Sequence, residues 1–262
     1  MTELCGIVLH PSGHTLSPLL HEEAYRELGL DAVYRVFDVP PGGLETFVRG
    51  LPQRRIRQLS VSLPHKEDAL GLAESSSEEA RRIGAANTLT RTAEGLRADN
   101  TDWLGVVRTL EPFGPWRGHQ AVVIGAGGAA RAVVYALVEL GVQVRVVNRT
   151  RERAQRLASE LGASLGDLDA PYDLLIHATP VGMDPNPEAT PVPTDALRPG
   201  ALVFDAVYRP LETRLLREAR TRGCRTVDGL RMLVHQAREQ IRIWSGISPS
   251  FDHLYRIARE SL

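Results

Sequence analysis

The chain has 262 residues, of which 31 are basic and 32 acidic, giving a net charge of −1 at neutral pH. Its length suggests two domains, and the balanced charge gives no reason to expect a nucleic-acid partner. No apolar run approaches the roughly 20 residues of a membrane helix, and the amino terminus lacks a secretory signal pattern. Because the two cysteines cannot form a disulfide framework, we expect a cytoplasmic protein with free thiols.

The first part of the chain alternates β-rich runs with helical patterns. Ser17 precedes Pro18 and is expected to cap a helix that ends at Gly29. Another helical pattern begins near Thr101, with Asn100 or Thr101 as its cap. Strands are expected over residues 5–9, 33–39, 56–63, 87–91 and 96–98. These elements predict an N-terminal α/β domain.

From His119 onward, strands alternate with longer helices. Strands are expected over residues 121–124, 142–147, 174–178 and 202–206, and helices from a glycine-rich turn through Leu140 and over residues 150–161 and 211–222. This alternation predicts βαβ units and a parallel sheet. A proline-rich surface loop is expected at residues 184–193, and residues 230–261 are helical with a break at 246–249.

The fold class is therefore α/β with two domains. Residues 1–103 and 236–262 are expected to form a substrate-binding and catalytic domain, to which the C-terminal helices return. Residues 104–235 are expected to form a Rossmann-type, doubly wound nucleotide-binding domain.

A glycine-rich motif lies between the first strand and the first helix of this second domain. In the pattern G-x-G-x-x-A, the first glycine makes a tight turn and the second lets the backbone approach a pyrophosphate. The small sixth residue lets helix and sheet pack closely, and the N–H groups of the helix terminus face the phosphates. The sequence therefore predicts a dinucleotide site at Gly125, Ala126, Gly127, Gly128 and Ala129.

The next strand ends where an NAD enzyme usually places an acidic residue to hold the ribose 2′-hydroxyl. This chain has neutral Asn148 there, followed by Arg149, Thr150 and Arg153, with Arg151 expected on a solvated helix face. A carboxylate would repel a 2′-phosphate, whereas a guanidinium binds it with two hydrogen bonds. The sequence thus favours NADP over NAD.

Lys66 is the only lysine in the chain, and the other 30 basic residues are arginines. Most surface positions accept either lysine or arginine, so a compositional drift toward arginine can replace lysines there without harm. A lysine is then retained where a compact ammonium with a movable proton is needed. Chance retention explains the presence of a single lysine equally well. Amide, hydroxyl and carboxylate groups gather in two nearby turns, at residues 84–88 and 99–102.

With these motifs in this order, the chain resembles the shikimate dehydrogenase (shikimate/quinate dehydrogenase) family over essentially its whole length. The family's S-x-S-P-x-x-H and N-V-T-x-P-x-K stand as residues 15–21 and 60–66. Its G-A-x-N-T, N-T-D, G-A-G-G-A and N-R-T stand as residues 84–88, 100–102, 125–129 and 148–150, and late motifs stand at 178–183, 205–208 and 229–236.

The resemblance implies reversible, NADPH-dependent reduction of 3-dehydroshikimate to shikimate, a step toward chorismate and the aromatic amino acids. It implies that Lys66 and Asp102 form the proton-transfer pair beside the reacting oxygen. The remaining roles that it implies are substrate carboxylate binding by Thr15 and Ser17, completion of the substrate pocket by Ser62, Asn87, Tyr208 and Gln236, and cofactor contacts by Thr179, Ala206, Gly229 and Met232. A monomer or homodimer is implied, and no metal is expected, because Pro11 and Gly13 deny His10 and His14 a helix.

The chain departs from the family pattern at four places. Residues 6–15 form a loop about three residues longer than the family's G-x-P-x-x-H-S, and Thr15 replaces the first serine of the next motif. Ser60 and His177 each replace an asparagine. Two alternatives therefore stay open, namely a related oxidoreductase acting on quinate or another ring hydroxy acid, and a non-catalytic NADP-binding regulator. Retention of Lys66 and Asp102 argues against the regulator.

Overall fold

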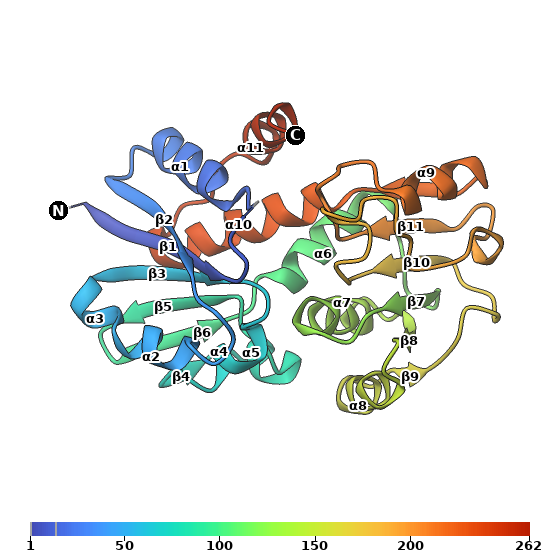
Figure 1. Ribbon diagram of the computed structural model, residues 1–262, viewed down its shortest axis with the longest axis horizontal. Helices are drawn as coiled ribbons and strands as arrows, with labels where there is room; N and C mark the ends of the chain where they lie inside the picture. The colour runs from blue at the N-terminus through green and yellow to red at the C-terminus, as the bar shows by residue number, and fades with distance from the viewer. Residues whose placement is uncertain (1, 14) are drawn as a thin grey trace. The chain divides into compact units, whose positions relative to one another are not determined.

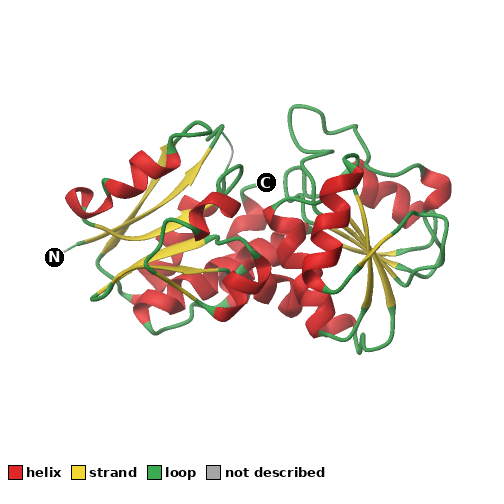
Figure 2. Ribbon diagram, turned by 90° about the horizontal axis from the view of Figure 1, so that it is seen from below, coloured by secondary structure: helices red, strands yellow, loops and turns green. Residues whose placement is uncertain are grey.

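The computed structural model describes residues 2–13 and 15–262 and divides the chain into two compact units. The first unit comprises the chain up to Asp102 together with Val234–Ser261, and the second comprises Trp103–Leu233. Both units combine helices with a sheet (Figures 1 and 2). His14, which the sequence analysis considered beside His10, lies outside the described residues.

The first unit is built on a six-stranded mixed sheet with the order β2-β1-β3-β5-β6-β4. β1 pairs in parallel with β2 and β3, β5 runs antiparallel to β3 and β6, and β4 pairs in parallel with β6. Its strands are β1 (Glu3–Leu9), β2 (Ala32–Asp38), β3 (Ile56–Val61), β4 (Ser75–Ser76), β5 (Thr88–Thr92) and β6 (Gly95–Asp99). Its shorter helices are α1 (Ser17–Leu28), α2 (Leu44–Arg49), α3 (Leu51–Arg54), α4 (Lys66–Leu70), α5 (Glu78–Ile83) and α11 (Phe251–Glu260).

The apolar positions of these strands explain the core of this unit. Val8, Leu59 and Leu89, from β1, β3 and β5, are fully buried and pack with residues of α2, α3 and α4. On α1 the buried residues include Leu20 and Ala24, and α1 packs against α11. Burial of one face of each helix against the sheet provides the hydrophobic stabilisation of the unit.

The start of α1 differs from the sequence prediction. Gly29 ends the helix in the left-handed conformation, with φ of 65°, as expected. Ser17, however, is the first helical residue and not the N-cap, a position that Leu16 occupies without a side-chain hydrogen bond. The backbone N–H of Ser17 instead donates to Oγ1 of Thr15 at 3.2 Å. The preceding hydroxyl thus supplies the acceptor for this end of the helix, and the prediction of Ser17 as the cap was wrong.

The second unit contains a parallel sheet with the order β12-β11-β10-β7-β8-β9. Helices lie on both sides of this sheet (Figure 2). Its strands are β7 (Gln120–Ile124), β8 (Gln143–Val147), β9 (Ser164–Leu165), β10 (Leu174–His177), β11 (Leu202–Asp205) and β12 (Arg225–Val227). Its helices are α7 (Gly128–Glu139), α8 (Arg151–Leu161), α9 (Arg214–Thr221) and the 3₁₀ turns η1 (Glu111–Phe113) and η2 (Thr194–Ala196). The strand order is that of a doubly wound dinucleotide-binding sheet, which confirms the predicted fold class.

The two remaining helices cross the division of the chain. α6 (Asp102–Leu110) begins at the last residue of the first unit's opening segment, and the division falls inside α10 (Gly229–Ser245). Residues 184–193 form turns and irregular backbone, and the break before α11 lies at 246–250, both close to the sequence prediction. Among the described residues, no helix is long and apolar enough to cross a bilayer.

Candidate active site

Lys66 and Asp102 form a partly enclosed ion pair in the first unit. Each lies at the first position of a short helix, Lys66 on α4 and Asp102 on α6. The Nζ of Lys66 donates to Oδ2 of Asp102 at 2.6 Å, with 13% of the lysine side chain and 5% of the aspartate side chain exposed. This exposure leaves the ammonium accessible while the carboxylate lies inside the protein. Such a pair can hold and release a proton next to a bound molecule.

Asn87 links the ion pair to the surrounding turns. Its Nδ2 lies 3.0 Å from Oδ1 of Asp102, 2.9 Å from Oγ1 of Thr101 and 3.2 Å from Oε1 of Gln236. Its Oδ1 accepts from the backbone N–H of Thr101 at 2.8 Å. Gln236, on α10, also accepts through its backbone carbonyl from the Thr101 hydroxyl at 3.0 Å. The structure therefore brings together Lys66, Asp102, Asn87 and Gln236, as the family resemblance implies.

A second group of hydroxyls lies near the start of α1. The hydroxyl of Thr15 donates to Oγ of Ser17 at 3.1 Å. The Tyr34 hydroxyl donates to Oγ of Ser60 at 2.7 Å, and the Ser17 side chain is also a hydrogen-bond partner of Tyr34. Burial raises the pKa of Tyr34, so its phenol stays protonated. Ser60, which replaces the family's asparagine, thus joins a neutral set of hydroxyls. Ser62, nearby in sequence, is partly buried.

Gln240 is a residue of this arrangement that the sequence analysis missed. Its Nε2 donates to the Asn87 carbonyl at 2.9 Å and to Oγ1 of Thr88 at 3.0 Å, and its Oε1 accepts from Ser60 at 2.9 Å. It therefore connects the hydroxyl group at Ser60 to Asn87. The signal was present, because Gln240 lies four residues after Gln236 and the two share one face of a helix.

The cofactor motif of the second unit has the backbone shape that its glycines predict. Gly125 follows β7 with φ of 127°, and a Cβ there would lie 2.7 Å from the Ala178 carbonyl oxygen. At Gly127 a Cβ would meet nothing within 4 Å. Gly127 is also the N-cap of α7 and has no side-chain hydrogen bond. The open space at Gly127 lies at the N-terminus of α7, whose N–H groups can bind a pyrophosphate. These residues are therefore compatible with a dinucleotide.

The other predicted cofactor residues lie at the carboxyl ends of neighbouring strands. Asn148 follows β8, and its Nδ2 donates to the Thr150 carbonyl at 3.0 Å. Arg149, Thr150 and Arg153 are exposed. Thr179 follows β10 and Ala206 follows β11, whereas Gly229 and Met232 lie in the first turn of α10. Tyr208, predicted to bind substrate, is in the second unit three residues after β11. Strand order reverses at β7 and β10, which is the usual ligand position in such sheets.

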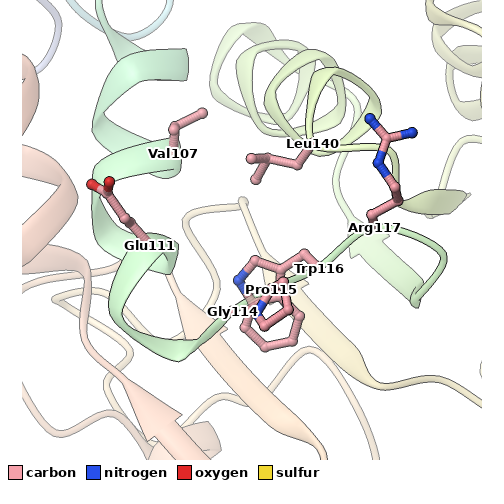
Figure 3. A pocket seen from close by; sticks show the side chains of 7 residues that line it. All are labelled: Val107, Glu111, Gly114, Pro115, Trp116, Arg117 and Leu140. Carbon is pink, nitrogen blue, oxygen red and sulfur yellow. The ribbon is translucent and has the colours of Figure 1, made fainter.

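A pocket of about 510 Å³ in the second unit contains none of the predicted site residues. Its lining is Val107, Glu111, Gly114, Pro115, Trp116, Arg117 and Leu140 (Figure 3). Figure 3 places Glu111 and Arg117 at opposite sides of apolar groups from α6, from the residue that follows α7 and from the segment after η1. The pocket is therefore separate from the glycine turn.

Together, the doubly wound sheet, its glycine turn and the lysine–aspartate pair define a two-domain oxidoreductase that uses a dinucleotide. Sequence models of three domains match the chain: the shikimate dehydrogenase substrate-binding domain at residues 7–89, shikimate/quinate 5-dehydrogenase at 109–180, and the shikimate 5′-dehydrogenase C-terminal domain at 229–259. The chain is 41% identical to a shikimate dehydrogenase (NADP+) of Methanosarcina mazei, over 100% of this chain and 99% of the relative. The chain belongs to the shikimate dehydrogenase family.

Solved structures agree with this assignment. Shikimate 5-dehydrogenase of Thermus thermophilus, solved with NADP(H) and shikimate, matches with a TM-score of 0.93 and 37% identity, and 100% of each chain is covered. A quinate dehydrogenase of Corynebacterium glutamicum, solved with NAD, matches with a TM-score of 0.89 and 31% identity, covering 100% of this chain and 99% of the other. The fold is thus shared by relatives that differ in substrate and cofactor.

Proposed function

We propose that the protein is an NADP-dependent shikimate dehydrogenase that interconverts 3-dehydroshikimate and shikimate. The observation that carries this proposal is the ion pair of Lys66 and Asp102 at 2.6 Å. The chain matches shikimate dehydrogenases over more than nine-tenths of their length. Retention of the sole lysine in that pair favours an enzyme over a binding protein that has lost catalysis.

The chemistry follows from the charge that develops on the substrate. Bound NADPH supplies the hydride. The Lys66 ammonium stabilises the negative charge that forms on the ketone oxygen and donates a proton to it. Asp102 accepts a hydrogen bond from the ammonium and so directs it, while Asn87 holds the other carboxylate oxygen. In the reverse direction, Lys66 takes the proton of the substrate hydroxyl.

Substrate binding is assigned to the neutral polar groups of the first unit. Thr15 and Ser17 lie at the start of α1, where the positive end of the helix dipole favours an anion. We assign the substrate carboxylate to these hydroxyls. Ser62, Asn87 and Gln236 are assigned to the ring hydroxyls of the substrate, and the substrate-binding role of Tyr208 stays a prediction from the family resemblance.

NADP binding is assigned to the glycine turn and to the exposed side chains after β8. The open space at Gly127 accommodates a pyrophosphate, and Arg149 and Arg153 supply guanidinium groups for a 2′-phosphate. Thr179, Ala206, Gly229 and Met232 are assigned to the remainder of the cofactor site.

Reduction of NADP+ with shikimate and with quinate, measured in parallel, tests this function. Lys66→Ala removes the ammonium and lowers kcat by about a hundredfold or more. Lys66→Arg keeps a positive charge but cannot release its proton, and it too is expected to lose turnover. Unchanged NADPH binding by both variants serves as the control. No turnover of either substrate by the wild type, with NADPH still bound, overturns the proposal in favour of the non-catalytic regulator.

Quinate is the second candidate substrate. The sequence of residues 6–15 is about three residues longer than the matching family pattern, and the family includes the quinate dehydrogenase named above. A higher kcat/KM with quinate than with shikimate would reassign the substrate while leaving the roles of Lys66 and Asp102 in place. Cytoplasmic location, and a monomeric or homodimeric state, remain predictions.

A further inference from the structure

His177 is a fully buried side chain that the reaction does not use. It is the last residue of β10, and this chain has histidine where the family pattern has asparagine. Its Nδ1 lies 2.9 Å from Oδ1 of Asp205, the last residue of β11, and its Nε2 lies 2.5 Å from Oγ1 of Thr179. The ring therefore bridges the end of β11 and the segment that follows β10, and these two strands are parallel neighbours (Figure 1).

The partners of Asp205 fix the direction of its hydrogen bond with His177. The Asp205 carboxylate also accepts from the backbone N–H of Val207 at 3.0 Å and from the Thr213 hydroxyl at 2.7 Å. The carboxylate, which already accepts these two hydrogen bonds, accepts a third from Nδ1 of His177, and the Thr179 hydroxyl, which can donate or accept, pairs with Nε2.

Thr179 and Ala178 lie directly against the glycine turn. A Cβ at Gly125 would lie 2.7 Å from the Ala178 carbonyl oxygen and 3.0 Å from the Thr179 methyl carbon. On the other side of the pair, a Cβ at Gly229 would lie 2.3 Å from the Ala206 carbonyl oxygen. The segments that His177 joins thus pack closely against two glycines that belong to the predicted cofactor site.

We propose that His177 is a positioning residue for NADP: its bonds to Asp205 and Thr179 hold the segments after β10 and β11 in the shape that seats the turn at Gly125. His177 has no exposed surface, so it acts on the cofactor through Thr179. This inference rests on the proposed NADP site. It adds a residue that the predicted cofactor site does not include.

The test uses the full-length protein and two measurements, steady-state kinetics with shikimate and fluorescence titration of NADPH. His177→Phe keeps a ring of similar size but removes both hydrogen bonds. We expect the KM for NADP+ and the Kd for NADPH to rise about tenfold, while kcat at saturating NADP+ and the KM for shikimate change by less than about twofold. His177→Gln offers both a donor and an acceptor and is expected to recover part of the affinity.

Further variants separate positioning from a loss of stability. Thr179→Val keeps the methyl that contacts Gly125 and removes the hydroxyl, so it should reproduce the effect of His177→Phe. The double variant should then bind NADPH no more weakly than either single variant, because both changes break the same hydrogen bond between His177 and Thr179. Thr213→Val is the matched control: it removes an Asp205 bond and the N-cap of α9, so Tm falls while NADPH affinity stays unchanged.

Three outcomes would overturn the inference. The first is a fall in Tm for His177→Phe with unaltered NADPH affinity, and the second is an effect of Thr179→Val that adds fully to that of His177→Phe. The third is His177→Gln binding no better than His177→Phe although it folds. Because NADPH titration needs no turnover, a wild type that binds NADPH but does not oxidise shikimate would overturn the proposed function alone.

Discussion

The Nδ2 of Asn87 lies 3.0 Å from Oδ1 of Asp102, on the opposite side of the carboxylate from Lys66. Asn87 is 1% exposed, so this hydrogen bond is shielded from solvent. The carboxylate is therefore fixed from one side by an amide and from the other by the lysine. This arrangement makes Asn87 a determinant of the direction in which the ammonium points.

Asn87→Ala is expected to lower kcat/KM for shikimate by about tenfold to a hundredfold, because a hydrogen bond to a charged group contributes about 1.5–3 kcal/mol. Steady-state kinetics at saturating NADP+ measures this. Asn186→Ala, in the exposed loop at residues 184–193, is the matched control and should behave as the wild type. Equal kinetics for Asn87→Ala and the wild type would remove Asn87 from the site.

Two glycines of the cofactor turn should respond differently to alanine. Gly125→Ala forces a side chain into a left-handed conformation and against a backbone oxygen, so we expect a lower Tm and a loss of about 1–3 kcal/mol of stability or more. Gly127→Ala meets no neighbouring atom, so its stability should stay within about 0.5 kcal/mol of the wild type.

The same Gly127→Ala variant should nevertheless bind NADPH about tenfold or more weakly, because its methyl occupies the space through which a pyrophosphate approaches. Thermal unfolding and NADPH titration on both variants check the contrast. A Gly127→Ala protein with wild-type affinity would place the phosphates elsewhere.

Arg149 is expected to set the preference for NADP over NAD. Arg149→Ala should raise the KM for NADP+ by about tenfold to a hundredfold, because the variant loses the guanidinium that binds the 2′-phosphate. The KM for NAD+ should stay nearly unchanged, because NAD+ has no 2′-phosphate. Arg156→Ala, an exposed arginine further along α8, controls for the general loss of positive charge. If Arg149→Ala and Arg156→Ala raise the KM for NADP+ equally, the effect comes from long-range attraction between positive charge and the cofactor, and not from a specific contact of Arg149.

His21 should make the protein less stable in acid. Burial lowers its pKa from 6.5 to about 3, and a side-chain hydrogen bond with Gln240 partly offsets this fall. Between these values the unfolded chain binds a proton that the folded protein does not, so the free energy of unfolding falls as the pH falls through that range. The contribution of this group is at most about 1.4 kcal/mol per pH unit.

His21→Phe keeps a ring stacked near Tyr34, which lies 4.1 Å away between centroids, and removes the titrating group. Urea denaturation of both proteins from about pH 7 to about pH 4 should give a shallower pH dependence for the variant. Parallel curves would mean that His21 does not contribute to acid sensitivity.

Much of the fold was predictable because its signals are local and periodic. The strands of the second unit are buried runs, and the glycine motif marks the end of β7, so a dinucleotide-binding sheet follows from the sequence. The short edge strands β4, β9 and β12 were missed, because two or three residues carry no periodic pattern. The antiparallel pairing of β5 with β3 and β6 likewise depends on contacts distant in sequence.

In the candidate site, too, residues in local motifs were predictable, whereas residues that depend on contacts distant in sequence were not. Lys66, Asp102 and Asn87 were identified from motifs, and the structure brings them into hydrogen-bond contact. The cap of α1 was misassigned because Thr15 and Ser17 offer the same hydroxyl two residues apart, and only the backbone geometry chooses between them. Gln240 was missed because its hydrogen-bond partners Ser60 and Asn87 lie far away in the chain. Its spacing from Gln236 places both residues on one helix face but does not identify those partners.

The sole lysine has a practical consequence. Within these 262 residues Lys66 carries the only side-chain amine, so reductive methylation with ¹³C-formaldehyde would place a label on a single side chain, in the candidate active site. One NMR signal would then follow the electrostatic environment of that nitrogen as substrate and nucleotide are added. The same property warns against amine coupling to a sensor surface, since the coupling would consume the residue on which catalysis is proposed to depend.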